Sequence, residues 1–182
     1  MRIIAGSRKG HTLQVSKVGV RPTSERVRES IFNRLQASQI EWSETVVLDL
    51  FAGSGAFALE SLSRGAKLAY AVEKDRDAFK VLDINTTKTR LPLTILKADA
   101  TKTLSIDIQN RFNLLFVDPP YEFANQDITE VLLSLQVQHL LDSKGVCIVE
   151  RSSHTEDFAI PVGFSLEDVR NYGDTRLFWL VW

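Results

Sequence analysis

The chain has 182 residues, of which 44% are hydrophobic and 25% charged, the proportions of an ordinary soluble globular protein with one core. No apolar run approaches the roughly 18 residues of a membrane span, and the N-terminus lacks the apolar stretch of a secretory signal. The only cysteine, Cys147, excludes an internal disulfide and falls in an apolar stretch, where packing is its expected role. We therefore expect a cytoplasmic monomer that has no membrane partner and no metal site.

The net charge of −1 conceals an uneven distribution. The first 34 residues contain eight basic and two acidic side chains, so they carry +6 and the remainder carries −7. Such an asymmetry is typical of a basic arm that contacts nucleic acid, but it also fits a solvated terminus, and charge alone does not decide between them. The candidate residues for contact with nucleic acid are Arg2, Arg8, Lys9, Lys17, Arg21 and Arg26.

The N-terminal stretch has a character of its own. Its first twenty residues carry three glycines between short β-prone stretches, as in an open hairpin or a flexible arm. Pro22 cannot lie inside a helix, and Thr23 is a good N-cap residue. Apolar residues then recur at helical spacing, which predicts a helix from about Ser24 to Leu35. We expect an arm over residues 1–22, followed by one domain over residues 23–182.

From residue 45 onwards, apolar strands alternate with helices. The expected strands are 46–51, 68–73, 93–97, 113–117 and 146–150. Three helices are expected between these strands. The first ends near Gly65, the second covers 76–89, and the third covers 128–141 and contains His139. Strands that are apolar throughout and alternate with helices predict an α/β fold with a mostly parallel sheet covered on both faces. Two final strands, 166–172 and 175–182, are expected to be joined by a tight turn at Gly173-Asp174.

A glycine pattern at the first strand-to-helix junction indicates a nucleotide-like ligand. Gly53-Ser54-Gly55 and Ala58 form G-x-G-x-x-A, in which small residues let a ligand approach the backbone and unpaired N–H groups at the helix start. Glu73 ends the next strand, twenty residues beyond Gly53, where its carboxylate can accept hydrogen bonds from two ribose hydroxyls. These features fit a nicotinamide dinucleotide as well as S-adenosylmethionine, and a purely structural turn is a third interpretation.

Two further carboxylates favour S-adenosylmethionine. Asp49 lies four residues before Gly53, where its charge would crowd a pyrophosphate but suits a cationic amino group or sulfonium. Asp99-Ala100 follows the third strand, where a carboxylate and a backbone N–H can contact an adenine edge, although Asp99 would serve equally as a helix N-cap. The expected cofactor-binding residues are Asp49, Phe51, Gly53, Gly55, Glu73, Asp99 and Ala100.

The motif Asp118-Pro119-Pro120-Tyr121 at the end of the fourth strand suits the methylation of an exocyclic amine. Such an amine is a poor nucleophile because its lone pair is delocalised into the ring. The Asp118 side chain and the Pro119 carbonyl can accept both amino hydrogens and favour a pyramidal nitrogen. Two prolines stiffen the turn, and Tyr121 offers a face on which an extruded base can stack. These four residues are the candidate catalytic residues.

The motifs together resemble those of a known family. The acidic Gly-x-Gly junction, the acidic end of the second strand and Asp-Pro-Pro-Tyr are similar to those of S-adenosylmethionine-dependent amino-group methyltransferases. The match narrows to the bacterial 16S ribosomal RNA guanine-N2 methyltransferases on further segments that reach from the arm to the last strand. These are Arg2-Ile3-Ile4-Ala5-Gly6, Gly10, Arg21-Pro22-Thr23, Arg26-Val27-Arg28-Glu29, Phe32-Asn33, Asp49-Leu50-Phe51-Ala52-Gly53-Ser54-Gly55 and Tyr172-Gly173-Asp174-Thr175.

The resemblance implies a Rossmann-like methyltransferase fold whose seven-stranded sheet has its last strand antiparallel. It also implies that the substrate is one guanine of 16S ribosomal RNA, in a partly or fully assembled small ribosomal subunit. Three alternatives stand beside it. They are an adenine N6-methyltransferase of DNA or RNA, a nicotinamide-dependent oxidoreductase, which Asp-Pro-Pro-Tyr disfavours, and a non-catalytic RNA-binding assembly factor.

Overall fold

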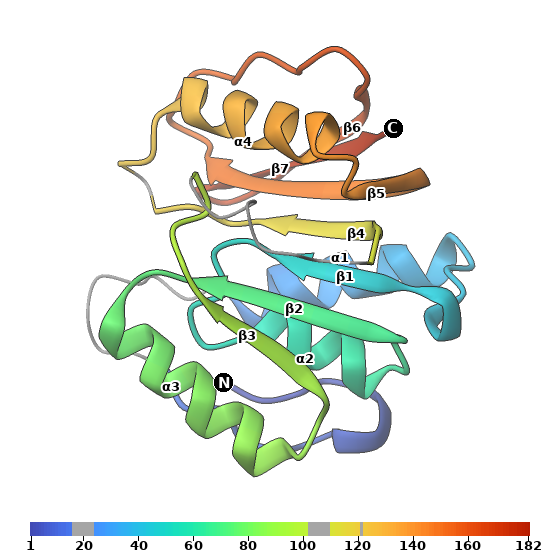
Figure 1. The fold of residues 1–182 in the computed structure, drawn as a ribbon, viewed down its shortest axis with the longest axis vertical. Coiled ribbons are helices and arrows are strands. Elements are labelled where there is room, and N and C mark those ends of the chain that lie inside the picture. Colours follow the sequence, from blue (N-terminus) through green and yellow to red (C-terminus); the bar gives the residue numbers. More distant parts are fainter. Residues whose placement is uncertain (16–23, 102–109, 121) are drawn as a thin grey trace.

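A computed structural model describes residues 1–15, 24–101, 110–120 and 122–182 of the chain (Figure 1). Its centre is a seven-stranded sheet of order β3-β2-β1-β4-β5-β7-β6. The strands are β1 (Val46–Asp49), β2 (Leu68–Glu73), β3 (Leu93–Lys97), β4 (Phe112–Val117), β5 (Leu141–Ser152), β6 (Ser165–Tyr172) and β7 (Thr175–Val181). The first five run parallel, and β7 is antiparallel to both of its neighbours. The expected α/β sheet with an antiparallel last strand is confirmed.

Helices cover both faces of the sheet. The α-helices are α1 (Glu25–Ala37), α2 (Ala56–Ser63), α3 (Arg76–Thr89) and α4 (Asn125–Val137). One buried cluster joins α1, α2 and Leu82 of α3 to one face, and a second joins α4 to the other face. In Figure 1, α4 lies over β5 and β7, whereas α1 and α2 lie behind the sheet. No described helix is long and apolar enough to cross a membrane.

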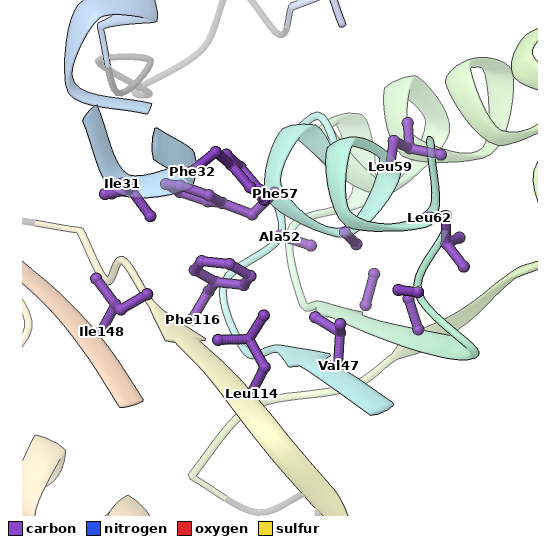
Figure 2. Packing of buried hydrophobic residues seen from close by; sticks show 14 of the residues in the cluster. Ile31, Phe32, Val47, Ala52, Phe57, Leu59, Leu62, Leu114, Phe116 and Ile148 are labelled. Atoms are coloured by element: carbon purple, nitrogen blue, oxygen red, sulfur yellow. The ribbon is translucent and has the colours of Figure 1, made fainter. Parts of the chain in front are cut away.

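Aromatic side chains fix α1 and α2 over the centre of the sheet. The Phe57 ring of α2 stacks on Phe116 of β4, with ring centroids 4.6 Å apart and planes 15° from parallel. Phe32 of α1 packs beside Phe116 at 5.8 Å, and Figure 2 shows the three rings together above the strands. Burying each such ring contributes about 1.5–3 kcal/mol. This packing holds the start of α2 against the ends of β1 and β4.

Two element boundaries differ from the expectations. The helix expected over 128–141 begins at Asn125 and ends at Val137, and β5 already starts at Leu141. The helix ends early because His139 adopts a left-handed conformation, with φ 55°, after which Leu140 N–H donates to Leu135 O. His139 therefore follows the helix and is not part of it.

Two shorter corrections concern the start of α1 and the end of β1. Ser24 is the N-cap of α1, because its side chain accepts the Val27 N–H at 3.2 Å. Thr23, the expected N-cap, lies outside the described residues. β1 ends at Asp49 and not at Phe51, since the chain leaves the sheet there to form the glycine turn.

Residues 1–15, called here the N-terminal segment, fold onto the domain. Arg2 and Thr12 form an antiparallel bridge, as an open hairpin requires. Ile3 and Leu13 are buried, at 1% and 2% exposure, so the expectation of a flexible arm is wrong for this part. The segment is held in place by its apolar contacts with α1 and α2. The proposed boundary at residue 22 falls outside the described residues.

Candidate functional site

The predicted site residues meet at one edge of the sheet. Asp49 ends β1 and Glu73 ends β2, while Asp99 follows β3 and Asp118 follows β4. The chain moves outward from β1 to β3 and then returns to the other side of β1 with β4. In open α/β sheets, ligands bind outside the carboxyl ends of the strands at such a switch point.

The cofactor loop, residues 50–55, needs its two glycines for different reasons. Gly53 has φ +52°, and a Cβ added there would meet nothing within 4 Å, so a ligand can approach this backbone directly. Gly55 has φ +80°, and its Cβ would lie 2.5 Å from Leu82 of α3. Gly53 therefore borders open space, and Gly55 lets the loop pack closely against α3.

Glu73 holds the cofactor loop as well as facing the site. Its Oε2 atom accepts the Gly53 N–H at 2.8 Å, and its Oε1 atom accepts the Asp75 N–H at 2.8 Å. Each carboxylate oxygen can accept more than one hydrogen bond. Glu73 can therefore anchor the loop and still receive ribose hydroxyls, and the anchoring role was not foreseen from the sequence.

Asp49 is a buried carboxylate in an acidic neighbourhood. It is 1% exposed, and its Oδ2 atom accepts the Ala58 N–H at 3.3 Å. Its Oδ1 atom is buried and has no hydrogen-bond partner within the described part of the chain. Burial and, to a smaller extent, the nearby charges of Asp118 and Glu73 raise the pKa of Asp49 to about 8. A cationic ligand group at this edge would relieve both effects.

Asp99 and Ala100 lie beside the end of β2, as expected. Ala98 N–H donates to Glu73 O at 3.2 Å, which ties the end of β3 to that of β2. Asp99 Oδ1 accepts the Thr101 N–H at 3.0 Å, a local turn bond, and Asp99 Oδ2 lies 3.8 Å from Lys74 Nζ. Ala100 is buried. The helix that Asp99 was expected to cap as an alternative falls in residues 102–109, which lie outside the described residues.

The loop after β4 is joined to the cofactor loop. Pro119 is buried, Pro120 is exposed and accepts the Phe123 N–H at 2.9 Å, and Tyr121 lies outside the described residues. The Phe123 ring meets Phe51 of the cofactor loop edge-on, with centroids 5.0 Å apart. This contact brings the two halves of the predicted site together.

Arg151 of β5 supports this loop, a role that the sequence-based reasoning missed. Its Nη2 atom donates to Phe123 O at 2.8 Å, and the residue is 5% exposed. Burial lowers the pKa of Arg151, and the Asp118 carboxylate opposes that shift. The Arg151 guanidinium is therefore close enough to the Asp118 carboxylate for their charges to attract. The sequence offered no clear signal for this role, because Arg151 follows Glu150 and lies just beyond the expected strand 146–150.

The predicted RNA-contacting residues divide into three groups. The side chains of Arg2, Lys9 and Arg26 are exposed. Arg8 is partly buried, and its Nε atom donates to Thr89 O at 2.6 Å, so it also fastens the N-terminal segment. Lys17 and Arg21 lie outside the described residues.

Arg26 borders a groove of about 450 Å³ between α1 and β6, together with Arg34 and Arg170. Both of these arginines pair with Asp168, and Arg34 also pairs with Glu167 at 2.9 Å. The groove is therefore close to charge balance and offers phosphate little net attraction.

The site fits S-adenosylmethionine better than a dinucleotide. The carboxylates of Asp49, Glu73 and Asp118 are close enough for their charges to interact, and such an acidic cluster suits a cation and repels a pyrophosphate. Asp49 Oδ1 is a buried acceptor that has no hydrogen-bond partner among the described residues. Within the described ranges, no three His, Cys, Asp or Glu side chains are arranged to hold a metal ion.

Comparison with known proteins agrees with this geometry. A model of the family described as Conserved hypothetical protein 95 matches residues 1–181. Ribosomal RNA small subunit methyltransferase D of Escherichia coli strain K12 is 33% identical over 174 residues, which cover 91% of this chain and 82% of that protein. The protein of the same name from Haemophilus influenzae is 37% identical over 142 residues, covering 74% of this chain and 69% of that protein.

Solved structures agree over the whole chain. The structure of the Escherichia coli protein yhhF covers 100% of this chain and 97% of its own, with a TM-score of 0.83 and 30% identity. That of a hypothetical protein from Thermus thermophilus covers 98% of each chain, with a TM-score of 0.80 and 27% identity. The fold is the Rossmann-like methyltransferase fold that the sequence predicts.

Proposed function

Since this chain belongs to the family described as Conserved hypothetical protein 95, we propose that it transfers a methyl group from S-adenosylmethionine to the exocyclic N2 atom of one guanine in 16S ribosomal RNA. Membership of the family makes the chain a ribosomal RNA methyltransferase. The cofactor, the base and the methylated atom are the proposed parts. The observation that carries the cofactor and the amine chemistry is the meeting of Asp49, Glu73 and Asp118 at the switch point of the sheet.

Each half of the site has its own task. Gly53 and Glu73 would hold the adenosine moiety, Asp99 and Ala100 the adenine edge, and Asp49 the cationic methionine end. Bound S-adenosylmethionine would supply a methyl group made electrophilic by its sulfonium. The loop after β4 would then place the base opposite that methyl group.

The nucleophile would be prepared by acceptors alone. Asp118 and the Pro119 carbonyl would each accept one amino hydrogen of the guanine, so that the nitrogen lone pair points at the methyl carbon. The amine nitrogen would bond the methyl carbon while the electrons of the C–S bond stay on sulfur, and the negative charge of Asp118 would balance the positive charge on nitrogen until the nitrogen releases one proton to solvent. Arg151 keeps this loop in place through Phe123 O. Tyr121 would stack on the extruded base. Catalysis of this kind rests on positioning and needs no covalent intermediate.

The choice of guanine N2 over adenine N6 rests on the family. Asp-Pro-Pro-Tyr serves either amine, and the named relatives act on small-subunit ribosomal RNA. Exposed Arg2, Lys9 and Arg26 are proposed to contact the phosphate backbone of that RNA, free or within the small ribosomal subunit. We also propose that the enzyme acts as a monomer in the cytoplasm.

The test of the mechanism is Asp118→Asn, which preserves shape and removes the charge. We expect methyl transfer to small-subunit RNA to fall about 100-fold or more, because a misoriented nucleophile costs about that much. Calorimetric affinity for S-adenosylhomocysteine should change little. Asp83→Asn, at an exposed aspartate of α3, is the matched control and should behave as wild type. If Asp118→Asn kept most of its rate, the amine would not be oriented by this carboxylate.

A further inference from the structure

Three separate segments meet at the side chain of Asn85 in α3, which is 0% exposed. Its Nδ2 atom donates to Ser54 O of the cofactor loop at 2.8 Å and to Gln14 O of the N-terminal segment at 3.0 Å. Its Oδ1 atom accepts the Gln14 N–H at 2.8 Å. One buried amide thus connects the cofactor loop with the N-terminal segment.

This set of hydrogen bonds, two donated and one accepted, requires a side-chain amide. A buried carboxamide is costly unless its donors and acceptor are satisfied, and Asn85 satisfies both N–H groups and its oxygen with backbone groups from outside its own helix. Packing alone would be served by an apolar residue such as Leu82, one turn earlier in α3. The asparagine therefore joins backbones that no apolar side chain could join.

Other contacts make the two segments move together. Ser54 Oγ lies 3.9 Å from Met1 Sδ, and the Met1 carbonyl accepts the Leu13 N–H at 2.9 Å. Glu60 of α2 is buried and accepts the N–H groups of Ile4 and Ala5, at 2.6 and 3.0 Å. A shift of the cofactor loop would therefore disturb contacts along the whole N-terminal segment.

The same segment carries two exposed cations, Arg2 and Lys9. If it contacts RNA, as the proposed function holds, the RNA surface and the cofactor site share Asn85 as a link. We propose that Asn85 is a positioning residue that couples the N-terminal segment to the cofactor loop, so that cofactor and RNA each favour the binding of the other. The inference rests on the proposed function for the role of the segment.

The experiment measures this coupling directly. The affinity for S-adenosylhomocysteine is measured by calorimetry with and without purified small ribosomal subunits, and the affinity for the subunits with and without S-adenosylhomocysteine. In the wild type, each should improve the other by the same factor, about fivefold or more, because linkage is reciprocal. In Asn85→Leu, which keeps the volume and loses the amide, the factor should fall towards one.

The control is Thr89→Val, one turn further along α3. Thr89 is buried, and its hydroxyl donates only to carbonyls of its own helix, at 2.9 and 3.1 Å. This variant loses a comparable buried hydrogen bond but keeps the Thr89 carbonyl that accepts Arg8 Nε, so its coupling should equal that of the wild type. Equal coupling in Asn85→Leu and Thr89→Val would overturn the proposal.

A measurement on the wild type covers the case in which Asn85→Leu does not fold. Hydrogen exchange of the Gln14 amide, which donates to Asn85, should slow when S-adenosylhomocysteine binds. Unchanged exchange would overturn the proposal. If the wild type bound S-adenosylhomocysteine and small ribosomal subunits without any effect of one on the other, only the proposed coupling would be contradicted. If it bound neither of them, the proposed function would be contradicted.

Discussion

Asp49 shows how a single residue limits what the site can hold. A carboxylate that is 1% exposed and lacks a partner on one oxygen is costly when ionised. Its neighbours Glu73 and Asp118 are also acidic, so an anionic ligand group would add to the repulsion. The position of Asp49 at the end of its strand could be predicted from the sequence, but its burial depends on the packing of α2 and could not be predicted from spacing.

The raised pKa of Asp49 predicts a dependence of stability on pH. Between the unfolded pKa of about 3.9 and the folded pKa of about 8, the folded state holds a proton that the unfolded state has lost. The free energy of unfolding should therefore fall as the pH rises through this window and level off above it. In Asp49→Asn this contribution is absent, so the variant should gain stability relative to the wild type as the pH rises. Urea unfolding without cofactor at several pH values measures the free energy of unfolding of both proteins. If this free energy changed with pH by the same amount in both, the raised pKa would not belong to Asp49.

Glu73 combines loop anchoring with a proposed contact to ribose. Glu73→Gln keeps the shape and one acceptor oxygen, but its NH₂ group cannot accept the second backbone N–H or a second hydroxyl. Losing charge-assisted hydrogen bonds costs about 1.5–3 kcal/mol each, so affinity for S-adenosylhomocysteine should fall roughly 10- to 100-fold by calorimetry. Glu156→Gln, at an exposed site, should bind as the wild type does. Tighter binding of NAD than of S-adenosylhomocysteine by the wild type would favour an oxidoreductase instead.

Among the elements, the N-terminal segment departs most from its sequence-based description. Its glycines and charges suggested a flexible arm, yet Ile3 and Leu13 are buried and Glu60 accepts two of its N–H groups. A periodicity analysis misses such a segment because its contacts are with residues of other elements, from 23 to 81 positions away along the chain. The bounds of β2, β3 and α3, whose patterns are local, were predicted closely. Those of β5 were not, since it spans Leu141–Ser152 and not 146–150, and the end of α4 depended on the left-handed conformation of His139.

The folded segment also decides which arginines test RNA binding. Arg8 is unsuitable because its side chain fastens the segment to Thr89 O. Arg2 and Lys9 have exposed side chains, so Arg2→Ala with Lys9→Ala should leave the fold intact. Each lost phosphate contact should flatten the plot of log affinity against log salt by roughly 0.7–0.9, or about one to two units for the pair.

Cofactor affinity should be unchanged in this double variant, because neither side chain reaches the cofactor loop. Lys67→Ala with Lys80→Ala, which removes two exposed cations elsewhere on the surface, is the matched control. An unchanged salt slope in Arg2→Ala with Lys9→Ala would assign RNA recognition to the rim around Asp118.

At the scale of the whole molecule, the sheet places four acidic residues from four strand ends beside one glycine loop. The order of those motifs along the chain was sufficient to predict this meeting, because parallel strands bring their carboxyl ends to one edge. Contacts across the fold were not predictable in this way. Arg151 behind Asp118, and Asn85 between the cofactor loop and the N-terminal segment, each depend on the packing of elements that lie far apart in sequence.

The most direct measurement of the central claim is the identity of the methylated nucleoside. Small ribosomal subunits from a strain lacking the protein are incubated with the purified enzyme and S-adenosylmethionine, and their RNA is digested to nucleosides for mass spectrometry. We predict N2-methylguanosine at a single position of 16S ribosomal RNA, absent without enzyme and absent with Asp118→Asn. N6-methyladenosine as the only product, or no methylated nucleoside, would contradict the account.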